Sequence, residues 1–565
     1  MSFADIIYIN GKIYTQDDSN PVAEAAAIKG KKFMWVGSTS QCMKLAGKDT
    51  KVTDLEGRTV LPGFLDGHTH PTTVAKTFWH IRMPRSHDRE TLYRTIKEYS
   101  EKYPKEDVPY FYGESYYAET FGTEGPRREE LDRLISDRPA RIQDFTDHAC
   151  WYNSMALEML GIDDGTGHVE SPIGEAEFIR DETGNATGWA LEAAPDGDLG
   201  IYEALGWYPP KGTEEEMAAP FLDFLKRYGV ICLMDGFTEG EEAIRMFYEM
   251  DAKGALNMFY EGTSMMSNVG EIDEAIARLR EWQEKYTSEH VHINTIKFFI
   301  DGTNEMGDSA SLEPMKNDPS GTNYGMAGTD AAQLADVLVR LNEENIDIHI
   351  HVVCDRGFRI CCDAVEKARE ICGEEWRIYV TLAHCELIHP DDMKRVAKLG
   401  IFIDWTTHWS GGYFGEAAIE YLGRDRWDTM YDFTEIIADG GIVGFSSDLF
   451  SYQEANRGNP YFGIQTAMTR VDPEMPLDPS RYPGSVRPPE KAKLSLEELI
   501  RGYTVNNAVR MRLDDKMGSI AAGKLANMVV LDRDIYAMPA DQIKDVRPVI
   551  TIFEGCVQKL RDVEF

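Results

Sequence analysis

Eight short apolar runs recur along the chain, and amphipathic helical patterns separate most of them. The runs are LPGFLDGHTH (61–70), GVICLMDG (229–236), ALNMFYEG (255–262), NTIKFFIDG (294–302), NIDIHIHVV (345–353), IYVTLAHC (378–385), LGIFIDWT (399–406) and GGIVGFSSD (440–448). Patterns such as EIDEAIARLREWQEKY and DAAQLADVLVRLNEE place apolar residues on one helical face. Two parallel strands joined by a helix need about 30 residues or more, and most spacings here are close to that. The alternation therefore predicts an α/β fold with eight parallel strands, a (β/α)8 barrel.

One spacing in this series is far too long for a single crossover helix. The first run ends at His70 and the second begins at Gly229. Residues from about 105 to 213 contain strand-like pieces of their own, such as VPYFYGESYY and ARIQDFTDH. We therefore expect an inserted α+β subdomain after the first strand, at the carboxyl end of the barrel. A second long segment, residues 303–330, follows the fourth strand, and loops of that length are usually functional.

Strand patterns also dominate both ends of the chain. Two apolar runs flank Asn10-Gly11 in DIIYI-NG-KIYT, which is a strong hairpin signal. The other end contains MGSIAAGKLANMVVLD and VITIFEGCVQKL, which also read as strands. We expect one small β-sandwich built from both termini, residues 1–60 and 513–565, with the barrel at residues 61–512.

Composition narrows the class of protein. A chain of 565 residues with 42% hydrophobic and 11% aromatic content is expected to be globular with more than one domain. A net charge of −37 argues against binding to nucleic acid or to an anionic membrane surface. The N-terminus lacks signal-peptide features, and the nine cysteines contain no C-x-x-C pair. We expect a cytoplasmic protein with reduced thiols and a small-molecule substrate, and a homodimer as the commonest assembly.

Residues that can ligate a metal fall at the carboxyl ends of five predicted strands, the rim where such barrels place their active sites. In GFLDGHTH, His68 and His70 are two apart, so a strand points both imidazoles to one face. The other candidates are Lys297 in IKFFIDG, His349 and His351 in HIHVV, His384 in VTLAHC and Asp448 in VGFSSD. Each alone could be a core histidine, a paired lysine or a helix cap. Their shared position favours one metal site.

These residues and their surroundings resemble the amidohydrolase superfamily. The resemblance is to its third amidohydrolase family, in the branch of N-substituted formamide deformylase-like proteins, and it covers nearly the whole chain. The stretches that carry it are VLPGFLDGHTHP, DHACWYNSMALEMLGI, TGWALEAA, IKFFIDG, HVVCDRG, AHCELIHPDDMKRVAKLGI, FSSD and GSIAAGKLANMVVLD. The resemblance implies a metal-bearing distorted barrel together with the composite sandwich.

Carried over position by position, the resemblance implies a set of metal ligands. His68 and His70 would bind the buried metal with Asp448. The ligands of strands five and six would be His351, rather than His349, and His384. Lys297 falls where related enzymes carry a lysine that is carboxylated on its amine and bridges two metals. An ammonium has only donors, whereas the carbamate is an anionic oxygen ligand. The expected cofactor is therefore one or two divalent ions, with Zn²⁺ the first choice, and N6-carboxylated Lys297.

The resemblance further implies a metal-dependent amidohydrolase that acts on carbon–nitrogen bonds other than peptide bonds. Metal-activated hydroxide would attack an N-substituted amide or formamide. Asp448 would take the proton of the water and return it to the leaving nitrogen. His148 in the insert and His408 after strand seven are candidate catalytic contacts to the carbonyl oxygen, or else structural residues. Cys354 and Thr406 depart from the family pattern, which bears on substrate preference.

Other reactions stay open on these residues. Ring opening of a cyclic amide, of the hydantoin or imidazolone kind, would need the same ligands. Deaminases of the superfamily typically carry H-x-x-E on strand five, where this chain has Cys354, and lack the strand-four lysine. A metal-dependent isomerase or decarboxylase, or a non-catalytic homologue, could share the same fold.

Overall fold

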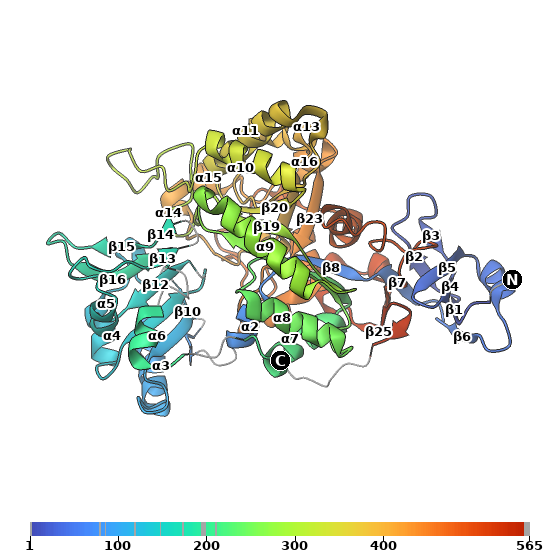
Figure 1. The fold of residues 1–565 in the computed structure, drawn as a ribbon, viewed down its shortest axis with the longest axis horizontal. Helices are drawn as coiled ribbons and strands as arrows, with labels where there is room; N and C mark the ends of the chain where they lie inside the picture. The colour runs from blue at the N-terminus through green and yellow to red at the C-terminus, as the bar shows by residue number, and fades with distance from the viewer. Residues whose placement is uncertain are drawn as a thin grey trace.

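The computed structural model describes residues 3–77, 81–84, 86, 88–117, 120–146, 148–171, 174–193, 199–208 and 212–558. Small parts of the predicted insert and of both predicted terminal segments lie outside these ranges. Figure 1 shows a barrel at the centre, an inserted sheet on the left and terminal strands on the right. Among the described residues, no helix is long and apolar enough to cross a membrane.

Eight parallel strands form the central sheet, and each predicted apolar run supplies one of them. The strands, in chain order and in sheet order, are β8 (Phe64–Thr69), β17 (Val230–Asp235), β18 (Phe259–Met266), β19 (Val291–Phe299), β20 (Asp347–Val352), β21 (Val380–His384), β22 (Phe402–Thr406) and β23 (Ile442–Ser446). From α7 onward, the helices between them are α7 (Glu215–Arg227), α8 (Glu241–Ala252), α9 (Ile272–Tyr286), α10 (Ala331–Glu344), α11 (Asp355–Cys372), α12 (Pro390–Met393), α13 (Val396–Leu399), α14 (Ile419–Leu422), α15 (Arg424–Trp427) and α16 (Thr434–Ala438). The predicted barrel is confirmed. Its strands are buried along nearly their whole length, as parallel strands covered on both faces are.

The crossover helices begin and end at residues suited to those positions. The Asp330 side chain accepts hydrogen bonds from the N–H groups of Ala332 and Gln333 and so caps α10. The same helix ends at Asn345, which has a left-handed φ of 55°. These local signals place the start of β20, and therefore the height of its histidines in the barrel.

The first and last strands of the barrel are joined by a side chain. β8 and β23 stand at the two ends of the hydrogen-bonded strand order. The buried Asn507, on α19 (Asn507–Arg510), lies between them. Its side-chain amide donates to the carbonyl of Leu65 on β8 at 2.6 Å and to that of Phe445 on β23 at 2.7 Å. One asparagine therefore satisfies a backbone carbonyl on each side of the junction between β8 and β23, which we call the seam.

Arg510 completes the seam, and two glycines make room for it. Its guanidinium donates to the carbonyl of Gly67 at 2.5 Å and to Asp404 at 2.7 Å. A Cβ on Gly67 would lie 1.9 Å from Arg510 Nη2, and one on Gly444 would lie 2.1 Å from Asn507 Oδ1. Neither position can carry a larger side chain unless the seam residues move.

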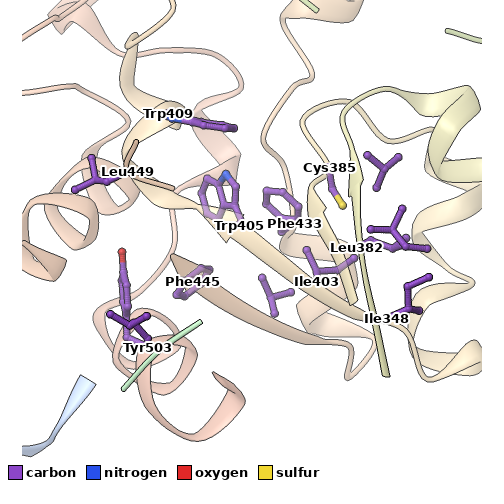
Figure 2. Close-up of a cluster of buried hydrophobic side chains, with 14 of the residues drawn as sticks. Ile348, Leu382, Cys385, Ile403, Trp405, Trp409, Phe433, Phe445, Leu449 and Tyr503 are labelled. Atoms are coloured by element: carbon purple, nitrogen blue, oxygen red, sulfur yellow. The ribbon is translucent and has the colours of Figure 1, made fainter. Parts of the chain in front are cut away.

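Aromatic residues fill the barrel wall beside this seam. Figure 2 shows Trp405 of β22 among Phe433, Phe445 and Ile403. The ring centres of Trp405 and Phe433 are 4.6 Å apart, and those of Trp405 and Phe445 are 5.7 Å apart. Trp409, four residues further along, stacks instead on the His384 ring, with centres 5.3 Å apart. The core and the rim of the barrel are thus connected through β22 and the turn after it.

The terminal strands form two further sheets, of which the second combines both ends of the chain. The first has the order β5 (Lys32–Gly37), β4 (Ala25–Lys29), β1 (Ile6–Ile9) and β6 (Lys51–Asp54). The second has the order β26 (Cys556–Val557), β25 (Pro548–Phe553), β24 (Met528–Leu531), β7 (Thr59–Pro62), β2 (Lys12–Tyr14) and β3 (Val22–Ala23). β24 pairs directly with β7, which supports the proposed composite domain.

Two details of the predicted terminal strands are wrong. β1 and β2 flank Asn10-Gly11 but belong to different sheets, so they form no hairpin. Asn10 has a φ of 56° and turns the chain from one sheet into the other. The run at 61–70 is also divided, because Leu61 and Pro62 end β7 whereas β8 begins at Phe64.

The inserted stretch contains a six-stranded sheet of its own. Its order is β15 (Glu177–Arg180), β16 (Ala186–Leu191), β12 (Ala149–Tyr152), β11 (Ala140–Asp144), β10 (Phe111–Tyr116) and β9 (Ile81–Arg82). The helices of this region are α3 (Arg89–Lys102), α4 (Arg128–Leu134), α5 (Ser154–Met159) and α6 (Leu199–Leu205). This is the expected α+β composition. Because β9 pairs with β10, the sheet takes in residues that precede the predicted start near residue 105.

The seam makes a testable prediction for stability. Asn507→Ala leaves two buried strand carbonyls without a donor and removes the acceptor of Arg510 Nε, 2.9 Å away. Each loss should cost about 1–3 kcal/mol of unfolding free energy. Asn506→Ala is the matched control, because the half-buried Asn506 side chain donates only to the Val443 carbonyl, at 2.8 Å. Denaturant unfolding should show a loss for Asn507→Ala at least twice that of the control. Equal losses would contradict the bridging role.

Candidate metal centre

The carboxyl ends of the barrel strands surround a cavity of about 120 Å³. The predicted site residues that line it are His68, His70, His148, Lys297, His351, His384 and Asp448. His408 is buried in the turn after β22 and is not one of the lining residues. The structure therefore gathers all the proposed metal ligands around one space, and the catalytic contact proposed for His408 stays a prediction.

The Asp448 carboxylate lies among three of these imidazoles. Its Oδ1 is 3.1 Å from Nε2 of His70 and 3.5 Å from Nε2 of His68, and its Oδ2 is 3.4 Å from Nδ1 of His384. The backbone N–H of Asp448 donates to the His68 carbonyl at 2.7 Å, which fixes the two strand ends together. One ligand atom from each of His68, His384 and Asp448 can be chosen so that all lie within 4.8 Å of one another. One ion could contact all three atoms.

Two of these residues have an unusual backbone. His384 has a φ of 74° and Asp448 a φ of 45°. The left-handed conformation costs a residue other than glycine on the order of 1–3 kcal/mol, and such residues cluster at functional sites. β21 ends at His384 and β23 ends two residues before Asp448, and both side chains line the cavity.

His68 also contacts two groups that the sequence did not identify as its partners. Its Nδ1 is 2.9 Å from Nε2 of His349 and 3.6 Å from Oδ2 of Asp404. Asp404 in turn accepts a hydrogen bond from Arg510. His349 and His351 both point into the barrel, but only His351 lines the cavity. This position favours His351 as the ligand of β20 and gives His349 the role of orienting His68.

Lys297 is buried in the barrel, and its amine loses its proton more readily there than an exposed lysine does. Its side chain is 1% exposed, and burial lowers its pKa to about 8, although Asp448 and Asp404 act in the opposite direction. Its Nζ lies 4.7 Å from the centre of the Phe299 ring. Among the described residues, no carboxylate forms an ion pair with it. The alternative of a lysine paired with a carboxylate therefore has no support in the structure.

His148 reaches the cavity from the insert and is fixed by Glu192. Its Nδ1 lies 2.9 Å and 3.0 Å from the two carboxylate oxygens of Glu192. Glu192 is 2% exposed and follows β16, and burial raises its pKa to about 8. The neighbouring strands β12 and β16 thus bring the insert's histidine and its partner together. The contact leaves Nε2 of His148 as the ring nitrogen available to a ligand.

The protonation states suit a divalent ion. Burial lowers the pKa values of His68, His351 and His384 well below the usual value, so their rings are neutral. Burial acts to raise the pKa of Asp448, but the hydrogen bond with His70 and electrostatic interactions with His70, Lys297 and His351 together outweigh it and leave this pKa below its usual value. Neutral imidazoles and a carboxylate are the donors that Zn²⁺ accepts. The residues fit the expected metal.

Sequence reasoning missed three carboxylates that line this cavity. They are Glu239, Glu305 and Glu386. In a chain with 96 Asp and Glu residues, each resembles a solvated surface group. A usable signal existed only for Glu386, which follows His384 by two residues at the end of a buried strand.

Comparison with known proteins is consistent with this geometry. The chain is 25% identical over 573 residues to the N-substituted formamide deformylase of Arthrobacter pascens, covering 98% of each. It is 25% identical over 450 residues to the exoenzymes regulatory protein AepA of Pectobacterium carotovorum subsp. carotovorum, covering 78% of this chain and 93% of AepA. The crystal structure of an uncharacterized metal-dependent hydrolase from Pyrococcus furiosus has the same fold, with a TM-score of 0.65 and 21% identity. That likeness covers 94% of this chain and 99% of the other.

The sequence as a whole settles the family. The model of the amidohydrolase family matches residues 51–557, which takes in the barrel, the insert and the C-terminal strands. The chain belongs to the amidohydrolase family.

Proposed function

We propose that this protein is a metal-dependent hydrolase that cleaves the carbon–nitrogen bond of an N-substituted amide, with Asp448 as the group that moves the proton. The position of Asp448 carries the proposal. Its carboxylate faces the cavity with imidazoles of His68, His70 and His384 within 3.5 Å. The name of the relative from Arthrobacter pascens supports the choice of an N-substituted amide, including a formamide.

The ligands proposed for the metal are His68, His70, His351, His384 and Asp448, with Lys297 as a carbamate. One or two divalent ions bound there would polarise the substrate carbonyl and lower the pKa of water. Lys297 can form the carbamate because an amine with a pKa of about 8 is partly neutral near pH 7. The neutral amine adds to carbon dioxide, a carbon–nitrogen bond forms, and one proton leaves.

Asp448 is suited to accept a proton and then give it up. Its lowered pKa keeps it ionised, so it can take a proton from the attacking water. The leaving nitrogen needs a proton to depart as an amine, and the same carboxyl can supply it. The adjacent His70 holds Oδ1 at 3.1 Å and keeps the carboxylate in one orientation.

His148 is proposed to bind the carbonyl oxygen of the substrate. Burial raises the pKa of Glu192 to about 8, and in its protonated form the carboxyl can donate to Nδ1 of His148. With Nδ1 accepting, the ring carries a proton on Nε2. That N–H can donate to an oxygen in the cavity and stabilise the negative charge that develops on it.

Substitution of Asp448 tests the reaction. Asp448→Asn keeps the size and one oxygen but removes the proton acceptor, so kcat should fall by about 10²–10⁴-fold. The assay is hydrolysis of a panel of N-substituted formamides and acetamides in ¹⁸O-water, with metal content measured on the same samples. Asp439→Asn changes an exposed carboxylate just before β23, at the opposite end of the barrel, and should behave as wild type. Turnover at the wild-type rate by Asp448→Asn, with one ¹⁸O atom from water in the acid product, would refute the role of Asp448 in moving the proton.

Substitution of Lys297 tests how many metal ions the protein binds. Lys297→Met should reduce two bound ions per chain to one and remove a carbamate resonance that ¹³C-bicarbonate produces in the wild-type NMR spectrum. Lys226→Met is the control, because Lys226 is also buried but pairs with Asp223 on α7. Two ions in Lys297→Met, or no carbamate in the wild type, would contradict the bridging role and leave the hydrolase proposal standing.

A further inference from the structure

A second cavity of about 390 Å³ adjoins the candidate metal centre. Three residues, Thr146, Glu305 and Phe414, line both spaces. The second cavity therefore begins one side chain away from the first. Its other walls come from the insert, at Tyr117 and Phe145, and from the segments that follow β22 and α17 (Pro460–Thr469).

The two volumes differ in what they can hold. A protein cavity of about 150 Å³ is large enough to bind benzene. The first cavity, at about 120 Å³, is smaller than that and must also accommodate the metal ions. It therefore suits the amide group better than a large substituent. The second, at about 390 Å³, is more than twice the size of such a benzene-binding cavity.

A continuous row of rings connects the metal centre to the second cavity. Neighbouring ring centres along it are between 4.6 and 5.3 Å apart. In order, the rings are those of His384, Trp409, Phe414, Tyr413, Phe145 and Tyr117. Such a wall suits an aromatic group, and aromatic faces also attract cations.

The charged side chains that line the second cavity are all carboxylates. Its described lining residues include five carboxylates and no lysine, arginine or histidine; the carboxylates are Asp144, Glu305, Glu416, Glu474 and Asp478. Glu474 and Asp478 are exposed, at the solvent side. Three nearby arginines are already paired: Arg481 with Glu416, Arg457 with Asp472, and Arg424 with Asp428. Arg457 also lies 3.6 Å from Glu474, and Arg424 lies 3.9 Å from Glu416. A substrate carboxylate would find no cation in this space.

We propose that the second cavity receives the substituent on the amide nitrogen, an aromatic group that is positively charged or neutral and not anionic. This inference rests on the proposed function for the position of the amide. The amide lies at the metal centre, and the substituent passes Phe414 to lie against Tyr413 and Phe145. The exposed carboxylates of Glu474 and Asp478 attract a cation at its far end. Anionic substrates, such as cyclic amides with a carboxylate arm, are excluded by the same charges.

Binding of benzyltrimethylammonium tests the cavity without any turnover. A quaternary ammonium has no lone pair, so it cannot ligate metal in the first cavity. By calorimetry on the metal-loaded protein, it should bind at least tenfold more tightly than benzyl alcohol, and added salt should reduce the difference. The double variant Glu474→Gln/Asp478→Asn should weaken cation binding three- to tenfold. The control double variant Glu374→Gln/Glu375→Gln removes two exposed charges before β21, at the other end of the barrel. It should leave the affinity for the cation unchanged. Equal affinity for the two probes, or equal loss in both variants, would overturn the proposal.

Rates of hydrolysis provide a second test of the proposal. N-benzylformamides with trimethylammonium, tert-butyl or carboxylate at the para position have the same scissile bond. The value of kcat/KM should be at least tenfold higher for the cation than for the carboxylate, with the tert-butyl compound between them. Faster hydrolysis of the carboxylate compound would refute the charge selection. If none of the three is hydrolysed, the proposed reaction fails, whereas the calorimetric result still decides whether the cavity binds an aromatic cation.

Discussion

The barrel depends on how its first and last strands are held together, because β8 and β23 end the strand order without a ladder between them. Asn507 bridges their carbonyls on one side of the seam. At the rim, two backbone bonds do the same, from Asp448 to the His68 carbonyl at 2.7 Å and from His70 to the Leu449 carbonyl at 2.9 Å. The proposed ligands come from both sides of this seam. Their mutual distances are therefore set by the same contacts that close the barrel.

Burial sets the charge of each group at the rim. It penalises every charged form, so it lowers the pKa values of His68, His351, His384 and Lys297 and raises that of Glu192. Asp448 is the exception among these, because the contact with His70 and further electrostatic interactions stabilise its ionised form. The result is a set of neutral imidazoles, those of His68, His351 and His384, beside an ionised Asp448. Such an arrangement is prepared for a cation before one binds, which reduces the reorganisation that binding requires.

The two cavities divide the proposed function between different parts of the chain. Strand ends of the barrel supply the groups that act on the amide, and those positions are rigid. The insert and the turn after β22 supply Phe145, Phe414 and most of the second cavity. Substitutions in these segments can change which substituent is accepted without moving the proposed ligands. This arrangement is one physical reason why a single barrel fold supports many substrates.

The sequence by itself determined the eight strands, because apolar runs and helix spacing are local properties that burial imposes on each segment. It also placed His68, His70, Lys297, His384 and Asp448 on one rim, since parallel strands share a direction. Only the tertiary structure decided the contacts between distant segments. Asn10-Gly11 joins two sheets rather than a hairpin, His148 meets Glu192 across 44 residues, and Asn507 meets Leu65 across 442. No local pattern encodes such pairs, because each depends on how the whole chain packs. The second cavity is of this kind, since its walls come from the insert and from the segments after β19, β22 and α17, which no sequence motif connects.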